Sequence, residues 1–112
     1  MTVTMIEERN RPIASALAAC VEACNSCSYN CNAGHEGMGD CARLCADCAA
    51  ICELTHTFLS RGSRWTGLVA EVAARVSLEC AAECGKFDDE YCRQCMPVCQ
   101  SAAEHCQELA GR

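Results

Sequence analysis

The sequence has few basic residues and no long hydrophobic run. Only nine of its 112 residues are lysine or arginine, against 15 aspartate and glutamate, and the formal net charge is −6. This balance argues against nucleic acid as a partner, because nucleic-acid-binding proteins present a basic surface, but it favours the attraction of cations. No window approaches the roughly 18 apolar residues of a membrane span. We therefore expect neither nucleic acid nor membrane as a partner.

The N-terminal segment lacks the apolar region of a secretory signal peptide. Its sequence, MTVTMIEERNRP, has Glu7 and Glu8 where a signal peptide would be basic. Fourteen cysteines in a short secreted chain would indicate a disulfide scaffold. Since no leader is present, we expect a cytoplasmic protein whose thiols stay reduced or bind metal.

The sequence also lacks a strand pattern and a catalytic constellation. Three Cys-x-x-Cys pairs would suit a thiol redox enzyme, but that motif is expected beside a βαβ pattern, which is absent; the pairs are Cys24/Cys27, Cys45/Cys48 and Cys92/Cys95. No nucleophile with a matched base, phosphate loop or paired-carboxylate cleft can be identified. We therefore do not expect an enzyme.

What the sequence does contain is a repeated cysteine motif. Cys-x-x-x-Cys-x-x-Cys-x-x-x-Cys occupies residues 20–31 and recurs at 41–52. These spacings place all the thiols of one row on one face of a helix. Their β-carbons would lie about 5–6 Å apart, too far for a disulfide, which needs roughly 3.8 Å. A soft metal ion can span the gap, and thiolates select Cu(I), Zn or iron–sulfur clusters. The rows therefore predict a metal-binding face, with a reduced apolar core as the alternative.

The same periodicity predicts four helices, at about 11–33, 40–61, 63–84 and 89–110. Short connections favour an all-α, antiparallel up-down-up-down four-helix bundle with a cysteine-lined core, formed as a single domain by residues 1–112. Pro97 falls inside the fourth helix, where it should remove one hydrogen bond and kink the helix near Arg93. In the third helix, we predict an inward face made of Trp65, Val69, Val72, Val76, Cys80 and Cys84.

This topology gives the two ends of the bundle different compositions. One end should be an apolar plug composed of Ile13, Leu17, Leu59, Trp65, Val69, Val72 and Leu109. The other end should be a mouth through which metal enters, composed of Cys31, Cys41, Cys80, Cys84 and Cys92. His35 and Met38 lie on the loop at the mouth and could hand metal inward. A solvated loop histidine is an equally good interpretation of His35.

The motifs resemble those of the cytosolic copper storage protein family. Besides the two rows, the resemblance rests on Glu83-Cys84-Gly85-Lys86, on Cys92-x-x-Cys95-x-x-x-Cys99 and on Glu104-x-Cys106. It implies a Cu(I)-filled bundle, usually a homotetramer, that stores copper or prevents its toxicity and could exchange it with donor or acceptor proteins. The ligands it implies are Cys20, Cys24, Cys27, Cys31, Cys41, Cys45, Cys48, Cys52, Cys80, Cys84, Cys92, Cys95, Cys99 and Cys106.

The chain departs from the family pattern in two places. Relatives often have histidines between the third and fourth helices, where this chain has Phe87-Asp88-Asp89-Glu90-Tyr91. Relatives can also have cysteines in the first half of the third helix, where this chain has Val69, Val72 and Val76. The second departure predicts a lower capacity.

The cysteine spacing favours Cu(I) independently of the resemblance. Cu(I) accepts sites of low coordination number, which an i,i+4 pair supplies, whereas Zn usually needs four ligands at tetrahedral corners. One copper held by two private thiolates leaves a buried negative charge, whereas one copper per thiolate is neutral. We therefore predict multiple Cu(I) ions, nearer roughly 14 than roughly 7 per chain. The alternative is a buffer for zinc or another thiophilic metal, of metallothionein character.

Overall fold

The chain folds into four long helices. The computed structural model describes residues 6–34 and 36–112. A short 3-10 turn, η1 (Glu8–Asn10), precedes α1 (Arg11–Ala33), α2 (Gly39–Arg61), α3 (Thr66–Cys84) and α4 (Glu90–Ala110). No strand occurs in these residues, and none of their helices combines the length and apolar character needed to span a membrane. The predicted all-α fold is confirmed.

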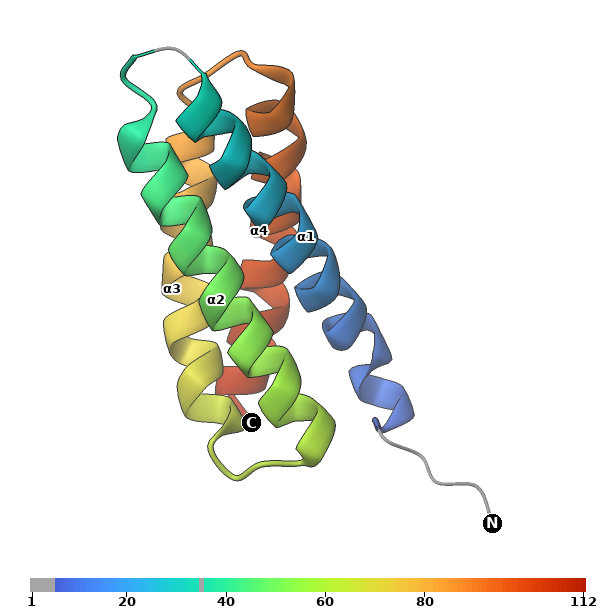
Figure 1. Ribbon diagram of the computed structural model, residues 1–112. Coiled ribbons are helices and arrows are strands. Elements are labelled where there is room, and N and C mark those ends of the chain that lie inside the picture. The colour runs from blue at the N-terminus through green and yellow to red at the C-terminus, as the bar shows by residue number, and fades with distance from the viewer. Residues whose placement is uncertain (1–5, 35) are drawn as a thin grey trace.

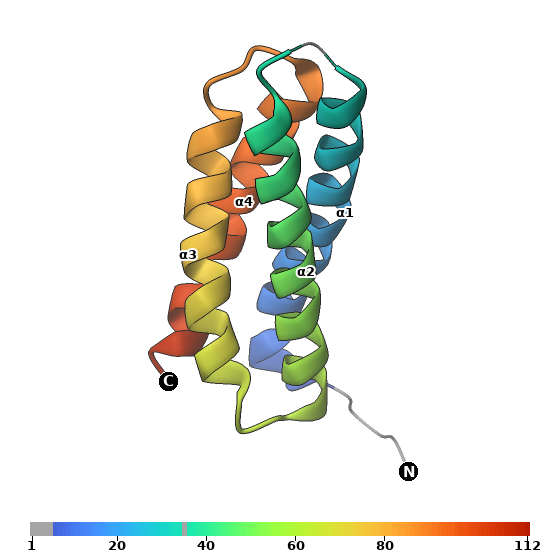
Figure 2. The same ribbon diagram turned by 60° about the vertical axis from the view of Figure 1, so that its left-hand side comes forward.

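The helices pack as an antiparallel bundle with up-down-up-down topology (Figures 1 and 2). Each helix packs against its neighbours in sequence, and α4 packs against α1 to close the bundle. The α1–α2 and α3–α4 loops lie together at one end, and the α2–α3 loop and the C-terminus lie at the other (Figure 1). The arrangement therefore has the two distinct ends that the sequence predicts.

The α2–α3 connection is a tight turn that delays the start of α3. Gly62 ends α2 in the left-handed region, with φ 66°, which favours glycine. Ser63 then accepts hydrogen bonds from the following residues, with its Oγ 3.1 Å from the Trp65 amide nitrogen and its carbonyl oxygen 3.2 Å from the Thr66 amide nitrogen. These contacts occupy residues 63–65, so α3 begins three residues later than predicted.

Pro97 does not end the fourth helix. The residues from Glu90 to Ala110 form one uninterrupted helix. The side chain of Pro97 is exposed on the outer face. The proline therefore leaves the inward face of α4 free for cysteines.

The predicted inward face of α3 is wrong in its first half. Trp65 and Val72 are exposed, at 51% and 46% of their accessible surface, and Val69 and Val76 are half-buried. The buried residues are instead Ala70, Ala73, Ala74, Ser77, Cys80, Ala81 and Cys84. Each residue is rotated by about 100° around the helix axis from the one before it. A step of four residues therefore ends about 40° beyond a full turn, and consecutive steps of four move progressively away from the original face. The predicted series 84, 80, 76 and 72 drifted off the face, whereas 84, 80, 77, 73 and 70 stays on it.

The core consists of an apolar plug and a column of thiols. At the plug, Ile13, Leu17, Leu59 and Leu109 are buried as predicted. Small alanines of α3 replace the predicted tryptophan and valines there. Burial of large aliphatic side chains contributes about 1.5–3 kcal/mol each. The plug therefore supplies hydrophobic stability that does not depend on the thiols.

Candidate metal centre

All 14 cysteines line the interior of the bundle. Each one is free and buried, and the most exposed of them, Cys31, retains only 3% of its accessible surface. They come from all four helices, because the alternating steps of three and four residues keep each row facing the axis. Every ligand proposed from the sequence therefore lies in the core.

The sulfur atoms lie close together both along and between helices. Along α1, the Sγ atoms of Cys20 and Cys24 are 3.7 Å apart. Between helices, the Sγ atoms of Cys24 and Cys99 and those of Cys45 and Cys80 are 3.4 Å apart. Sulfur atoms at these separations could share one soft metal ion, and one sulfur could bridge two ions.

Eleven of the cysteines form four groups of four, in each of which all Sγ atoms lie within 4.8 Å of one another. The groups are Cys20, Cys24, Cys48 and Cys99; Cys24, Cys80, Cys95 and Cys99; Cys27, Cys41, Cys84 and Cys92; and Cys27, Cys45, Cys84 and Cys95. Five cysteines, Cys24, Cys27, Cys84, Cys95 and Cys99, belong to two groups each. The groups therefore form one continuous network.

Of the other three cysteines, Cys31 and Cys52 extend this network, and Cys106 lies below it on α4. The Sγ atom of Cys31 lies 3.8 Å from that of Cys27 at the mouth, and the Sγ atom of Cys52 lies 3.8 Å from that of Cys20. Cys106 is buried one turn below Ala102 on α4, towards the plug residue Leu109. The thiol column thus runs from the mouth to the plug.

Ser77 is a member of this core that the sequence analysis missed. Its Oγ atom lies 3.5 Å from the Sγ atom of Cys48 and 3.6 Å from that of Cys52. The hydroxyl is fully buried and occupies the α3 position one step before Cys80. Counting back from Cys84 in alternating steps of four and three would have found it.

The close sulfur contacts couple the ionisation of the thiols. A hydrogen bond with Cys20 lowers the pKa of Cys48, and a hydrogen bond with Cys24 lowers the pKa of Cys95. A hydrogen bond shared with Cys20 raises the pKa of Cys24. Burial raises the pKa of Cys106 to about 12. Ionisation of one thiol therefore depends on the protonation of its neighbours, and filling the column with metal must release the protons that the thiols hold.

No positively charged side chain is buried in the described core. Among residues 6–34 and 36–112, the buried polar side chains are those of Asn10, Thr55 and Ser77. Any charge carried by metal–thiolate clusters therefore has to be balanced within the clusters themselves, because buried charge is costly.

Met38 and Tyr91 close the mouth over the thiols. Met38 is fully buried, and the Tyr91 hydroxyl donates a hydrogen bond to its Sδ atom at 3.3 Å. A β-carbon at Gly34 would lie 2.9 Å from the Tyr91 oxygen, so a larger residue there would displace the Tyr91 side chain. Burial and the nearby Asp89 carboxylate raise the pKa of Tyr91 to about 12, so the hydroxyl keeps its proton at neutral pH. His35 lies outside the described residues.

A cavity of about 260 Å³ reaches the thiols beside this cover. It lies between the end of α3 and the start of α4, and Cys84 and Cys92 line it together with Phe87 and Met96. Both cysteines belong to the group nearest the mouth. The cavity therefore lies against the outermost thiol group, whose Cys84 and Cys92 have no accessible surface of their own.

Known proteins share both the sequence pattern and the fold. The family model for copper storage proteins (Csp) matches residues 6–111. The uncharacterized cysteine-rich protein YhjQ of Bacillus subtilis (strain 168) is 29% identical over 108 residues, which cover 95% of this chain and all of that protein.

Two solved structures of copper storage proteins are similar. The Cu(I)-bound protein BsCsp3 superposes with a TM-score of 0.87 at 28% identity, covering 92% of this chain and 99% of that one. The protein Ccsp from Streptomyces lividans, loaded with 10 copper equivalents, gives a TM-score of 0.79 at 30% identity, covering 88% of this chain and 81% of that one. Since the family model spans nearly the whole chain and the fold agrees, this protein belongs to the copper storage protein family.

Proposed function

We propose that this protein binds and stores multiple Cu(I) ions through the thiolates of its 14 core cysteines. The observation that carries the proposal is the continuous network of sulfur atoms in a core to which residues 6–34 and 36–112 contribute no buried cation. Thiolate is a ligand that Cu(I) prefers. Family membership and the Cu(I)-bound relative BsCsp3 support the same assignment.

The charge balance of the core sets the expected stoichiometry. One Cu(I) per thiolate forms a neutral cluster, because each bound ion replaces one proton. Two private thiolates per copper would leave a buried negative charge for each ion, with no buried cation to offset it. We therefore expect a capacity nearer about 14 than about 7 ions per chain.

The test is an anaerobic titration of the fully reduced apo-protein with Cu(I) in the presence of a competing chelator. An endpoint near the cysteine count, with one proton released per ion, is the expected result. An endpoint at half the cysteine count would refute the neutral-cluster argument. Failure to take Cu(I) from the chelator would refute the storage role.

A zinc buffer is the second candidate, and one observation favours it. Zn²⁺ bound to four thiolates with Zn–S bonds near 2.3 Å requires sulfur atoms about 3.8 Å apart, and several Sγ pairs in the four groups have this spacing. Each such site would, however, carry two buried negative charges, and the groups share thiols. Repeating the titration with Zn²⁺ separates the two functions, because a zinc buffer would retain Zn²⁺ and show no preference for Cu(I).

We propose that copper enters at the mouth with the help of Met38 and His35. The thioether of Met38 is a soft ligand that suits Cu(I). Met38 is the N-cap residue of α2, at the end of the α1–α2 loop, and its Sδ atom accepts a hydrogen bond from Tyr91 in the first turn of α4. His35 is on the same loop and could receive the ion first.

The proposed role is binding and storage in the cytoplasm rather than catalysis. A structural relative from Streptomyces lividans is described as a cytosolic copper storage protein. All three Cys-x-x-Cys pairs lie within helices and are buried among other thiols. This placement favours a metal-filled core over an exposed redox pair. Donor or acceptor proteins would deliver and withdraw the copper.

We further propose that copies of this chain assemble into a homotetramer. An apolar surface lies at the start of α3, which we call the α3 surface and define as Trp65, Leu68 and Val72. These side chains are 51%, 58% and 46% exposed, and they follow one another at helical spacing on the outside of the bundle. Contiguous exposed apolar side chains are typical of protein–protein contacts. A closed tetramer needs such complementary surfaces.

A further inference from the structure

We propose that Cu(I) exchanges with the thiol column at a second place, Cys95, through a groove between α1 and α4. This inference rests on the proposed copper-binding function and concerns how the column is filled. The groove lies on the side of the bundle rather than at its mouth. It has a volume of about 330 Å³, and Cys95 is the only cysteine among its lining residues in the described part of the chain.

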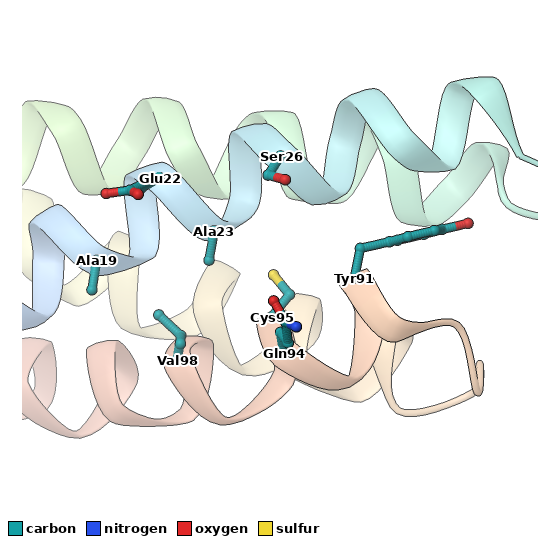
Figure 3. A pocket seen from close by; sticks show the side chains of 8 residues that line it. All are labelled: Ala19, Glu22, Ala23, Ser26, Tyr91, Gln94, Cys95 and Val98. Atoms are coloured by element: carbon teal, nitrogen blue, oxygen red, sulfur yellow. The ribbon is translucent and has the colours of Figure 1, made fainter.

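Small side chains of α1 create the groove. Figure 3 shows Ala19 and Ala23 of α1 facing Cys95 and Val98 of α4, with the Cys95 sulfur directed towards α1. Alanine carries only a methyl group, so only small side chains of α1 cover this thiol, which has no accessible surface of its own. A loop joins each pair of consecutive helices, but no loop joins α1 to α4 at either end of the bundle. The seam between the first and last helices is thus the natural site for lateral access.

The groove has a polar rim that suits a charged or hydrated copper complex. Glu22 and Ser26 of α1 and Gln94 of α4 line it together with the alanines. A carboxylate, a hydroxyl and an amide can hold water and small polar ligands by hydrogen bonds. A small thiol carrying Cu(I) fits this chemistry better than a large apolar ligand does.

Cys95 occupies a special position in the sulfur network. It belongs both to the group that contains Cys80 and to the group that contains Cys45, and its Sγ atom lies 3.7 Å from Cys24 and 3.6 Å from Cys99. An ion delivered to Cys95 can therefore move towards the plug or towards the mouth by exchanging one sulfur at a time. Filling from the mouth alone would force each inner ion past outer sites that are already occupied.

The exchange at Cys95 is a ligand substitution without electron transfer. A neutral complex of Cu(I) with one small thiolate enters the groove, and a bond forms between copper and the Cys95 sulfur. One bond from copper to a carrier sulfur breaks, and the Cys95 proton leaves on the departing carrier thiol. Copper stays Cu(I) throughout, and the charge of the complex is unchanged.

The test compares loading rates in Ala23→Leu, which fills the groove beside Cys95, and in Ala50→Leu, a matched change at an exposed position of α2. Cu(I) is presented with excess 2-mercaptoethanol under nitrogen, and binding is followed by the ultraviolet charge-transfer absorbance of copper thiolates. We expect Ala23→Leu to load several-fold more slowly than wild type with the same final capacity, and Ala50→Leu to load normally. If Ala23→Leu loads at the wild-type rate, the proposed entry of copper through the groove is wrong.

A second measurement uses the unmodified protein and does not depend on either variant folding. Reduced apo-protein is treated with a limiting amount of iodoacetamide, and the modified cysteines are mapped by mass spectrometry. We expect Cys95 to react at least as fast as Cys84 and Cys92, which line the cavity at the mouth. Modification of Cys95 only after the inner cysteines would overturn the inference. If either experiment gives the contradicting result but the copper capacity is normal, only the exchange of copper at Cys95 is refuted. If the protein binds no Cu(I) at all, the proposed function itself is refuted.

Discussion

At the scale of single residues, Cys106 shows how burial controls the thiols of the apo-protein. Its side chain has no accessible surface, and burial raises its pKa from 9.0 to about 12. The folded protein therefore holds the Cys106 proton more tightly than the unfolded chain does. This difference stabilises the fold below pH 9 and is lost as the pH rises from 9 towards 12.

We predict that the free energy of unfolding of the reduced apo-protein falls between pH 8 and pH 11, and that Cys106→Ala lessens this fall by about 2–3 kcal/mol. Urea denaturation under nitrogen at the two pH values measures both quantities. The cavity left by the substitution lowers stability equally at each pH, so it cancels in the comparison. Equal falls in the two proteins would show that the Cys106 pKa is not raised.

At the scale of helices, three of the four inward faces could be predicted from the sequence. In α1, α2 and α4 the cysteines themselves alternate in steps of three and four, so the thiols mark the face. In α3 only Cys80 and Cys84 mark the inward face. The prediction followed the larger apolar residues and wrongly assigned Val72 and Val76 to that face. The inward positions there are occupied by alanine and serine, so the hydrophobicity of the α3 residues does not mark the buried face.

The composition of the candidate site was predictable, but its grouping was not. Spacing along one helix places pairs such as Cys20 and Cys24 together, and these pairs are confirmed as close neighbours. The contacts of Cys24 with Cys95 and Cys99 depend on how α4 is rotated and shifted against α1. No local pattern specifies that relation, so the four-thiol groups emerge only in the folded bundle.

The corrected face of α3 leads to a prediction about capacity. Ser77→Cys places a thiol beside Cys48 and Cys52, and we expect it to raise the Cu(I) endpoint by about one ion per chain, because each neutral unit needs one thiolate. Val72→Cys serves as the matched control, since it adds a thiol at a position that faces outwards. The chelator-competed titration measures both. A gain in Val72→Cys without a gain in Ser77→Cys would restore the original assignment of the face.

At the scale of the whole molecule, the apolar plug at one end of the bundle stabilises the fold, and the thiol column above it provides the proposed storage site. The plug residues are large and aliphatic, whereas the column above them is built from small, polarizable thiols. Classical zinc fingers are unfolded without their metal, but this bundle has an apolar core of its own. The sulfur positions are therefore set before any ion arrives, so that binding need not organise the backbone.

Assembly of whole molecules is testable at the α3 surface. We predict that the wild-type protein sediments as a tetramer and that Leu68→Glu sediments as a smaller species, because a charge on an apolar contact surface is costly to bury. Tyr29→Glu introduces the same charge on the exposed face of α1 and should leave the tetramer intact. Analytical ultracentrifugation distinguishes these outcomes, and an unchanged tetramer in Leu68→Glu would place the contacts elsewhere. The copper capacity per chain should be equal in all three proteins.

The buried serine of α3 also bears on how such proteins diverge. Most serine codons lie one nucleotide from a cysteine codon, and Ser77 already occupies a position within reach of two thiols. A single mutation there can change the amount of copper held while the helices, the plug and the mouth stay as they are.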